Sequence, residues 1–526
     1  MTSELSKRTV LEQLNFGERI AEDEKDELAN YFVETDQWAR VASGAVDVIF
    51  GAKGAGKSAI YTTLMNRERE LSDRGVITVS AENPRGSTVF SGLTSNPPTS
   101  EAEFVAIWKT YILTLLGSLV VDYGMQGKEA EEVKDVLVRE QLLPPAGAKL
   151  STRLRIVWDW VKGALQRGSA EGGMALDPAT QMPAGVSIKL SLGEPSTEQR
   201  RRGVLSLNAL LDKCDSALKV NDLSVWILFD RLDVAFADSR ALEANGIRAL
   251  FRAYGDLRSL DNVGLKIFLR SDIWDEITAD VGFREASHIT KRLDIQWGPA
   301  SLLNLVVKRL VKNGRALTFY GETEASVLES IESQRDFFDR IVPDQVDVGK
   351  NPRTFDWILG RVMDGTRRTA PREVIHLLTE ARNEQVTMMD RGEDEPSDQA
   401  LLSRAALRAA LDPVSRTRLE QTVYAEYPTE KPWIQKLEGQ KTEQSLISLA
   451  ETWNVTPQEA GSRAQRLRDI GFFELRGSRE EPTFWVPFLY RLGLHMRQGS
   501  ADSPNNDTTE PEPEPLFGDL EVVIDG

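Results

Sequence analysis

The fold of this 526-residue chain is decided by one stretch near its start, Val46-Asp47-Val48-Ile49-Phe50-Gly51-Ala52-Lys53-Gly54-Ala55-Gly56-Lys57-Ser58. The apolar run before Gly51 is typical of a buried parallel strand. The eight residues that follow match G-x-x-x-x-G-K-[ST] at every fixed position, and the segment after them has the composition of a helix. A strand, a glycine-rich loop and a helix in this order predict an α/β fold with a phosphate-binding loop.

Each fixed position of this loop has a chemical reason. Glycines let the backbone curl closely enough for its N–H groups to point at an anion, and the dipole of the following helix favours the same charge. We expect Lys57 to reach the β- and γ-phosphates and the Ser58 hydroxyl to bind Mg²⁺. The predicted cofactors are ATP and Mg²⁺. The predicted nucleotide contacts are Gly51, Ala52, Lys53, Gly54, Ala55, Gly56, Lys57, Ser58 and Ala59.

A second apolar run, residues 224–229, ends at Asp230, which we predict to be the protein ligand of Mg²⁺ beside Ser58. Many ATPases place a catalytic glutamate directly after this aspartate, but here the position holds Arg231. Asp233 is therefore predicted to orient or deprotonate the attacking water. Capping of the next helix is the alternative role for Asp233.

A third apolar run, residues 264–269, ends in Arg270. Open α/β sheets bind ligands at the carboxyl ends of their strands, so Arg270 is predicted to sense the γ-phosphate. A salt bridge from Arg270 to Asp272 or Asp233 is the alternative. Together the three strands predict a P-loop NTPase sheet of the AAA+/ASCE type.

Taken in order, these segments resemble a family of bacterial P-loop ATPases named after a cyanobacterial open reading frame. The family is related to the KAP and STAND branches of the AAA+/ASCE ATPases. The resemblance covers residues from about 15 to 390 and, more weakly, to 499. It rests on Tyr31-Phe32-Val33-Glu34-Thr35, residues 49–60, Asp230-Arg231-Leu232-Asp233, Phe268-Leu269-Arg270-Ser271-Asp272-Ile273, Ile295-Gln296-Trp297 with the helix to Leu310, and Thr369-Ala370-Pro371-Arg372-Glu373-Val374-Ile375.

The resemblance implies three further features. Arg372 would be a sensor-2-like arginine that contacts the nucleotide from a helical lid, with a surface salt bridge as the alternative. A homo-oligomer would supply an arginine in trans, for which Arg284, Lys291 and Arg292 are candidates and Arg292 ranks first. Some relatives belong to antiphage defence systems. KAP relatives often carry membrane helices in the ATPase core, and this chain departs from that pattern.

The predicted organisation has five parts. Residues 1–30 form an N-terminal segment, 31–310 the P-loop core with a helical insertion at about 100–220, 311–395 an all-α lid, 396–499 a winged-helix-like domain and 500–526 an acidic disordered tail. Within the insertion, helices are predicted near 101–123, 128–141, 151–167 and 199–219. Such an insertion is a candidate surface for an effector protein.

One segment, residues 104–121, is nearly long and apolar enough to cross a membrane. Lys109 lies inside it and its flanks lack basic clusters, so we predict a buried helix, no membrane contact and a cytoplasmic protein. The single cysteine, Cys214, and the three histidines exclude a disulfide scaffold and a Cys/His zinc site.

Near the C-terminus, Thr456-Pro457-Gln458-Glu459 predicts a capping box that begins a helix, in which Thr456 caps and Glu459 reaches back. This helix carries Arg463, Arg466 and Arg468, and a predicted hairpin follows at 472–487. The order resembles a winged helix, so the three arginines are predicted to contact DNA or RNA. Protein contacts are the alternative for this region.

The charge is unevenly placed. The chain has 81 acidic and 64 basic residues and a formal net charge of −17. Residues 501–526 contain eight acidic residues and no basic one, so a locally basic face elsewhere remains compatible with the total. The tail is predicted to be a solubility segment, a docking peptide for a partner protein or an acidic mimic of nucleic acid.

These patterns lead to one main hypothesis and one alternative. The first is a Mg²⁺-dependent ATPase that couples ATP binding or hydrolysis to a conformational change in an oligomer, with DNA contact through the winged helix. The alternative is a nucleotide-gated switch with negligible turnover that recruits a protein partner. Arg231, in the place of the usual glutamate, keeps that alternative open.

Overall fold

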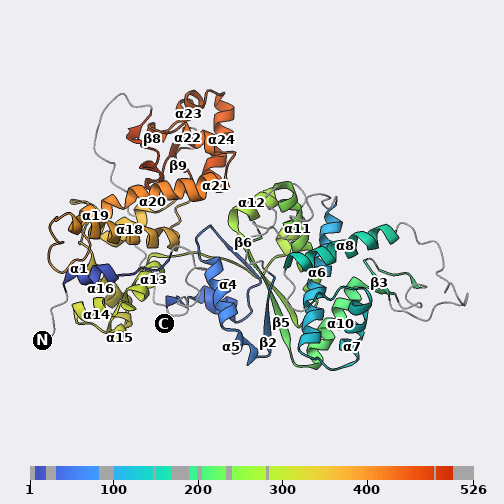
Figure 1. Ribbon diagram of the computed structural model, residues 1–526. Helices are drawn as coiled ribbons and strands as arrows, with labels where there is room; N and C mark the ends of the chain where they lie inside the picture. Colours follow the sequence, from blue (N-terminus) through green and yellow to red (C-terminus); the bar gives the residue numbers. More distant parts are fainter. Residues whose placement is uncertain are drawn as a thin grey trace, which may run out of the picture. The chain divides into compact units, whose positions relative to one another are not determined.

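The computed structural model describes residues 6–18, 31–81, 100–145, 150–168, 189–192, 194–197, 204–232, 240–279, 283–478 and 481–501. The chain divides into two compact bodies (Figure 1). The sheet body comprises Asp36–Gly51 and Ile60–Ile295, and the lid body comprises Met1–Thr35, Ala52–Ala59 and Gln296–Gly526. The predicted domain boundaries at 310 and 395 stay predictions, since this division follows contacts rather than sequence segments.

The sheet body is built on five parallel strands in the order β2-β5-β6-β1-β7. They are β1 (Val48–Gly51), β2 (Val76–Ser80), β5 (Ser224–Phe229), β6 (Val263–Arg270) and β7 (Arg292–Asp294). Strand β6 lies between β1, which leads into the glycine-rich loop, and β5, which leads to Asp230. A strand inserted at this place characterises the ASCE class of P-loop NTPases. The predicted fold class is confirmed.

Helices accompany the sheet along the chain. They are α3 (Asp36–Ala42), α4 (Lys57–Asn66), α5 (Glu68–Ser72), α11 (Arg240–Leu257), α12 (Ser271–Ala279) and the short 3₁₀ helix η3 (Arg284–His288). The central strands β1, β5 and β6 are buried on both faces, with every residue of β1 and five of six in β5 buried. This explains their continuous apolar sequences, because an alternating pattern arises only when one face meets water.

A buried ion pair fixes the amino end of β1 and β6. The Lys266 ammonium, 1% exposed, donates to the carbonyl of Val46 at 2.5 Å and to the Asp47 carboxylate at 3.0 Å. It also lies 4.6 Å from the ring centroid of Trp226. Burial lowers the pKa of Lys266 although Asp47 acts in the opposite direction. These bonds hold the register of the two strands, which sets what meets at their other end.

The long connection between β2 and β5 contains the predicted helical insertion. It comprises α6 (Glu101–Asp122), α7 (Lys128–Arg139), α8 (Leu150–Gly168), β3 (Lys189–Ser191), β4 (Val204–Ser206) and α10 (Leu207–Val220). Helices α6, α7 and α10 pack on one another, as Figure 1 shows in blue to green. The helix predicted from residue 199 was wrong at its start. Residues 204–206 form a strand, and α10 begins after Ser206, whose side chain accepts the N–H of Ala209.

Helix α6 contains the apolar segment that is nearly long enough to cross a membrane. Within the described residues it is the one helix with the length and hydropathy of a membrane span, and 67% of its apolar window is buried by the protein. Its Lys109 makes an ion pair with Asp256 at 2.5 Å and a hydrogen bond to Asn208 at 2.9 Å. A charged group paired inside protein packing supports the prediction of a buried core helix.

The lid body begins with an N-terminal helix that the sequence did not reveal. Its helices are α1 (Lys7–Gln13), α13 (Pro299–Val311), α14 (Gly314–Tyr320), α15 (Glu324–Leu328), α16 (Ile331–Ile341), α17 (Thr354–Arg361), α18 (Pro371–Asp390), α19 (Arg404–Ala409), α20 (Leu411–Arg418), the π-helical η4 (Leu419–Val423) and α21 (Tyr424–Glu426). The Arg382 guanidinium of α18 donates to the carbonyl of Leu11 at 3.0 Å and so ties α1 to the lid. One hydrophobic cluster runs from Val10 to Leu494.

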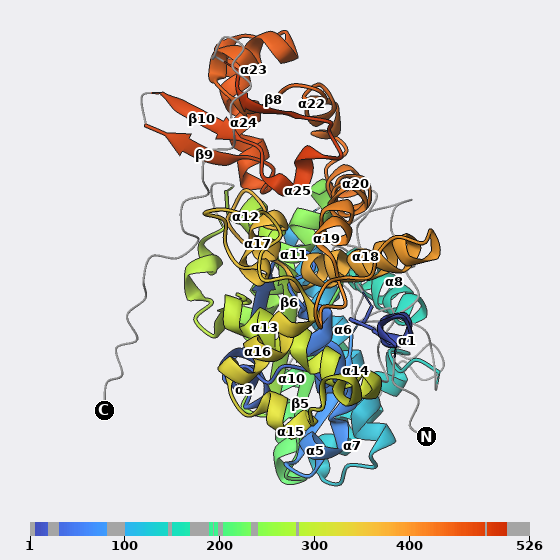
Figure 2. The same ribbon diagram turned by 90° about the vertical axis from the view of Figure 1, so that its left-hand side faces the viewer.

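The C-terminal part of this body has the element order of a winged helix (Figure 2). It comprises α22 (Lys431–Gln435), β8 (Lys441–Gln444), α23 (Leu446–Trp453), α24 (Pro457–Asp469), β9 (Glu474–Gly477), β10 (Pro482–Trp485), α25 (Phe488–Arg491) and β11 (Arg497–Ser500). The sheet order is β11-β8-β10-β9, so the strand before α23 pairs with the hairpin that follows α24. The predicted order of two helices and a hairpin is present, with β8 and β11 in addition, and the winged-helix assignment stays a prediction.

One of the two bonds of the predicted capping box is present at the start of α24. The Thr456 hydroxyl accepts the N–H of Glu459, as an N-cap does. The Glu459 carboxylate, however, accepts a bond from Arg463 one turn later. The reciprocal half of the capping box was therefore a wrong prediction, because a charge-assisted bond to a guanidinium is stronger than one to a backbone N–H.

Candidate nucleotide-binding site

Three predicted residues meet at the carboxyl edge of the parallel sheet. In the β1–β6 ladder Gly51 is paired with Arg270, the last residues of their strands. In the neighbouring ladder Phe229 is paired with Ile267, so Asp230 follows β5 at the same edge. Both Arg270 and Asp230 are buried, at 8% and 7% exposed. The sheet thus gathers a cation and a carboxylate where the glycine-rich loop leaves β1.

Arg270 has a partner on the next helix. Its Nε and Nη2 donate to the two carboxylate oxygens of Asp272 at 3.0 and 2.7 Å. This bidentate bond is the alternative that the sequence left open, and it fixes the direction of the guanidinium. The role of Arg270 as a γ-phosphate sensor stays a prediction. The bond to Asp272 means that such a sensor would have a fixed orientation.

The backbone after Asp230 has an unusual conformation. Arg231 adopts a left-handed conformation with φ 55°, which a residue with a side chain adopts at a cost of about 1–2 kcal/mol. Such strain is concentrated at functional turns, where the surrounding structure maintains it. Asp233, predicted to act on the attacking water, lies outside the described residues.

The glycine-rich loop itself, Ala52–Ala59, belongs to the lid body. Gly54 and Gly56 have φ of +84° and +96°, values that glycine alone adopts without strain. The Lys57 ammonium donates to the carbonyl of Ala52 at 3.1 Å across the loop. Helix α4 starts at Lys57, so its first N–H groups and its dipole face the loop, as an anion site requires.

Trp297 supports the loop from a segment that sequence chemistry did not single out. Its indole N–H donates to the carbonyl of Ala55 at 2.8 Å. Its ring lies 3.8 Å from where a Cβ on Gly56 would be. The only sequence signal for Trp297 was its place in Ile295-Gln296-Trp297, which entered as part of the family resemblance.

The predicted lid arginine lies against the same loop. A Cβ built on Gly54 would be 3.0 Å from the Cβ of Arg372 and 3.5 Å from its Nε. Arg372 is the second residue of α18, after Pro371 at the helix start. Its neighbour Glu373 accepts from Arg418 of α20 at 3.0 Å in a buried pair. The structure therefore brings Arg372 to the phosphate loop, and its contact with nucleotide stays a prediction.

A second lid residue reaches the loop. The Lys53 ammonium makes a 2.5 Å ion pair with the Glu426 carboxylate of α21, and both side chains are about one-quarter exposed. Lys53 was predicted only as a loop backbone position, and nothing in the sequence pointed to Glu426. The Glu426 carboxylate opposes phosphate binding at this loop, because it pairs with the ammonium group that would otherwise attract a phosphate.

The residues proposed to hold Mg²⁺ are a hydroxyl and a carboxylate, Ser58 and Asp230. Oxygen donors of this kind, completed by phosphate oxygens and water, suit Mg²⁺. The described residues contain no cluster of three or more His, Cys, Asp or Glu side chains with metal-binding geometry. These two oxygen donors suit a cation whose remaining ligands are phosphate oxygens and water.

Two of the three candidates for a trans-acting cation, Arg292 and Lys291, lie at the amino end of the parallel strands. Arg292 begins the edge strand β7 and is paired with Val48, at the amino end of β1, where it is exposed. Lys291 lies 3.9 Å from Asp47 at the same end. Arg284 begins the 3₁₀ helix η3. A role for Arg292 in a neighbouring subunit stays a prediction.

The three arginines of α24 are engaged within their own module. Arg463 pairs with Glu459 and lies 5.0 Å from the Trp433 ring centroid. Arg466 donates to Glu430, whose side chain is 4% exposed, at 2.8 Å. Arg468 lies 3.4 Å from Asp469. The exposed row of the helix instead consists of Gln458, Ser462, Gln465 and Asp469.

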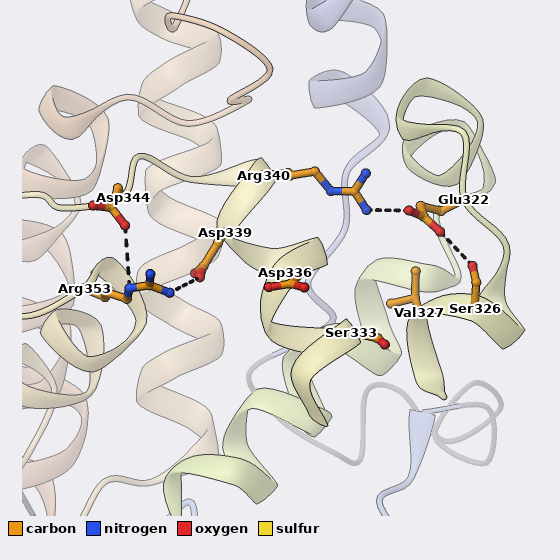
Figure 3. Close-up of a pocket in the computed structure, with 9 residues that line it drawn as sticks. All are labelled: Glu322, Ser326, Val327, Ser333, Asp336, Asp339, Arg340, Asp344 and Arg353. Carbon is orange, nitrogen blue, oxygen red and sulfur yellow. Dashed lines mark hydrogen bonds and ion pairs between the residues drawn. The ribbon is translucent and has the colours of Figure 1, made fainter. Parts of the chain in front are cut away.

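One pocket of about 650 Å³ lies elsewhere in the lid, between α15, α16 and the segment before α17 (Figure 3). Its carboxylates are largely paired. Glu322 accepts from Arg340 at 2.7 Å and from Ser326 at 2.7 Å, and Arg353 bridges Asp339 and Asp344. These contacts indicate a structural ion-pair network, which stabilises the turn between α16 and α17.

Comparisons with known proteins add a distant likeness. No protein-family model and no curated protein matches the sequence. Similar solved structures include the ORC1 protein of Aeropyrum pernix in complex with DNA, at 13% identity and a TM-score of 0.35, covering 87% of this chain and 90% of that one. The ORC2 protein of the same organism, with ADPNP and ADP, has 13% identity and a TM-score of 0.39, covering 90% and 91%.

A Walker-type ATPase of Pyrococcus abyssi is also similar, at 10% identity and a TM-score of 0.36, covering 88% of this chain and 96% of that one. At such values these likenesses carry no argument about the site. The function must therefore be inferred from this chain's own residues.

Proposed function

We propose that the protein is a Mg²⁺-dependent ATPase in which the nucleotide controls the lid and the winged-helix-like region. One observation carries the proposal. A complete phosphate-binding loop follows β1. The last residue of β1, Gly51, is paired with Arg270 of β6, and Asp230 follows the end of the neighbouring strand β5. The parallel sheet, the strand order and the helix start at Lys57 supply the context that the motif requires.

Each residue has a definite task in this proposal. Loop N–H groups and Lys57 hold the phosphates, while Ser58 and Asp230 bind Mg²⁺, which neutralises charge on the β- and γ-phosphates. Arg270, oriented by Asp272, contacts the γ-phosphate from the sheet edge. Arg372 contacts the nucleotide from α18. Asp233 orients the attacking water.

Steady-state ATP hydrolysis of the purified full-length chain tests this function. Lys57→Ala and Asp230→Asn should each lower turnover on the order of 10²–10³-fold, since each removes a charge from the transition-state site. Asp233→Ala should lower turnover while leaving Mg-ATP affinity nearly unchanged. Wild-type turnover equal to that of Lys57→Ala, with tight Mg-ATP binding retained, would support the switch instead. Absence of Mg-ATP binding would contradict both.

The ion pair between Lys53 and Glu426 supplies a route for coupling within the lid body. A bound triphosphate places several negative charges at the loop and competes with Glu426 for the Lys53 ammonium. Nucleotide binding therefore weakens the hold of the loop on α21, which leads into the winged-helix-like region. By thermodynamic linkage, the ion pair must weaken nucleotide binding to the same extent.

Glu426→Gln tests the coupling. The variant should bind Mg-ATP about 3- to 10-fold more tightly, as expected for a partly exposed ion pair of roughly 1 kcal/mol. Glu420→Gln is the matched control, because Glu420 is an exposed glutamate of the adjoining η4 segment. Equal affinities for the wild type and Glu426→Gln would remove Glu426 from the mechanism.

Other parts of the assignment rest on the family resemblance or on composition. We propose a homo-oligomer with Arg292 acting in trans, a cytoplasmic location and an association with antiphage defence. A partner protein would bind the helical insertion or the acidic tail, whose residues 502–526 lie outside the described structure. Copurification followed by a size measurement tests the oligomer and the partner together.

A further inference from the structure

A second set of arginines lies on the hairpin of the winged-helix-like region and on a lid loop bonded to it, and it differs from the set on α24. Arg367 and Arg368 lie in the loop between α17 and α18, and Arg476 lies on β9. All three residues are exposed, with 65% of the Arg367 side chain and 40% of the Arg476 side chain accessible. None of them belongs to α24.

The loop that carries Arg367 is fixed to the end of α24 by its backbone. The N–H of Gly365 donates to the carbonyl of Gly471 at 2.7 Å. A side chain at Gly365 would collide with the backbone carbonyl of Phe473. Asp364 accepts the N–H groups of Thr366 at 2.9 Å and of Arg368 at 3.2 Å. These bonds leave the loop little freedom and place Arg367 beside the hairpin.

Arg367 is held in an unfavourable backbone conformation. Its φ is 59°, in the left-handed region that a side chain disfavours. A position with this φ would be cheaper with glycine or asparagine. A residue in this region persists where its surroundings fix it, as the bonds of the loop and the contact with Glu474 do here.

One buried carboxylate aligns two of the guanidinium groups. The Glu474 side chain is 10% exposed, and its Oε1 accepts from Arg367 at 2.9 Å and from Arg476 at 3.1 Å. Its Oε2 accepts from Arg476 at 3.2 Å. The Arg476 guanidinium also lies 3.8 Å from the ring centroid of Trp485. Each guanidinium has five N–H donors, and these two each use two of them on Glu474.

We propose that Arg367, Arg368 and Arg476 form a surface that binds the phosphate backbone of duplex DNA. Pre-aligned guanidinium groups with spare donors match phosphate oxygens in geometry and charge. The exposed row of α24, Gln458, Ser462, Gln465 and Asp469, offers amide and hydroxyl groups of the kind that contact base edges, and the Gln465 amide donates to Asp469 at 2.7 Å. Phosphate contacts come from the loop and the hairpin, whereas Arg463 and Arg466 of α24 are engaged by Trp433 and Glu430.

The proposal goes beyond the proposed ATPase function and is independent of ATP hydrolysis. It is tested with the full-length chain and a fluorescently labelled duplex of mixed sequence, by anisotropy over a series of salt concentrations. Arg367→Ala/Arg476→Ala should weaken binding at least tenfold and reduce the slope of log K against log salt by about 2, since each phosphate contact contributes about 0.9. Arg463→Ala/Arg468→Ala is the matched control and should keep the wild-type slope.

Two further variants guard against a folding defect at Glu474. Arg368→Ala leaves Glu474 and its partners intact and should reduce the salt slope by about 1. Arg367→Lys/Arg476→Lys retains the charges and should recover most of the slope. An absence of duplex binding by the wild type at low salt would overturn the proposal. So would an equal loss in the α24 control, or preference for a phosphopeptide over the duplex.

Nucleotide binding by the same proteins separates this proposal from the ATPase. The Arg367→Ala/Arg476→Ala variant should bind Mg-ATP with wild-type affinity. Lys57→Ala should lose Mg-ATP and keep the wild-type salt slope for DNA. A failure of either activity therefore leaves the other measurable.

Discussion

The phosphate loop and helix α24 both drew attention as sequence motifs, yet the structure treats them differently. In the loop, the fixed residues are where the chemistry requires them, with positive φ at Gly54 and Gly56 and a helix that starts at Lys57. In α24, the arginines are engaged by residues such as Trp433 and Glu430 of the preceding segment. A motif that depends on backbone conformation can be predicted from the sequence. The direction of a side chain cannot, because it depends on the residues that pack beside it.

Alanine substitutions at Gly365 and Gly255 test how tightly the α17–α18 loop is packed, and Gly365→Ala should have the larger effect on stability. Gly365→Ala should lower the free energy of unfolding by about 1–3 kcal/mol, because the new Cβ would meet the backbone of Phe473, which cannot move away alone. Urea denaturation measures the change. Gly255→Ala, in α11 with open space around the glycine, is the control and should be neutral or slightly stabilising. Equal stabilities of the two variants would contradict the docking of the loop.

Arg466 separates a structural arginine from a surface one on the same helix. Arg466→Ala should lower the free energy of unfolding by roughly 1–3 kcal/mol, because it leaves the buried Glu430 carboxylate without this partner. Arg468→Ala should cost about 0–1 kcal/mol, since its pair with Asp469 is exposed. Chemical denaturation with both variants checks the order, and the reverse order would contradict a structural role for Arg466.

Gly54 is the counterpart of Gly365 within the phosphate loop. Gly54→Ala should weaken Mg-ATP binding about tenfold, since a left-handed conformation costs alanine about 1–2 kcal/mol and its Cβ would press on Arg372. Calorimetric titration measures the affinity. Global stability should change less than in Gly365→Ala, because the facing atoms belong to a flexible side chain. Unchanged affinity would show that the loop conformation is not the binding one.

The smallest expected effect is a pH dependence in the lid. Burial alone would raise the pKa of Asp347, but hydrogen bonds from Trp357 and Arg408 and the charge of Arg361 hold it below its ordinary value. The resulting stability is present above the unfolded-state pKa, near 3.9, and is lost as the pH falls through the folded-state value. Asp347→Asn should therefore flatten the acid limb of a stability–pH profile. An acid limb identical to that of the wild type would exclude Asp347 as its source.

Much of the site was predictable because its logic is local. Strand, loop and helix follow one another in sequence, and carboxyl ends of parallel strands share one edge, so the sequence alone was enough to place Asp230 and Arg270 near Gly51. Trp297, Glu426 and Glu474 could not be found in this way. Each acts on a residue far away in the chain, through contacts that carry no periodic or motif signal.

The sequence by itself determined the class of fold, the phosphate loop and the order of the strands' polar ends, because these follow from short-range backbone chemistry and hydrophobic pattern. Only the tertiary structure decided which charged groups act together. It paired Lys53 with Glu426, directed Arg466 to Glu430, and joined Arg367 to Arg476 through Glu474. The physical reason is that a charge takes its role from its nearest partners, and those partners are brought together by the packing of distant elements.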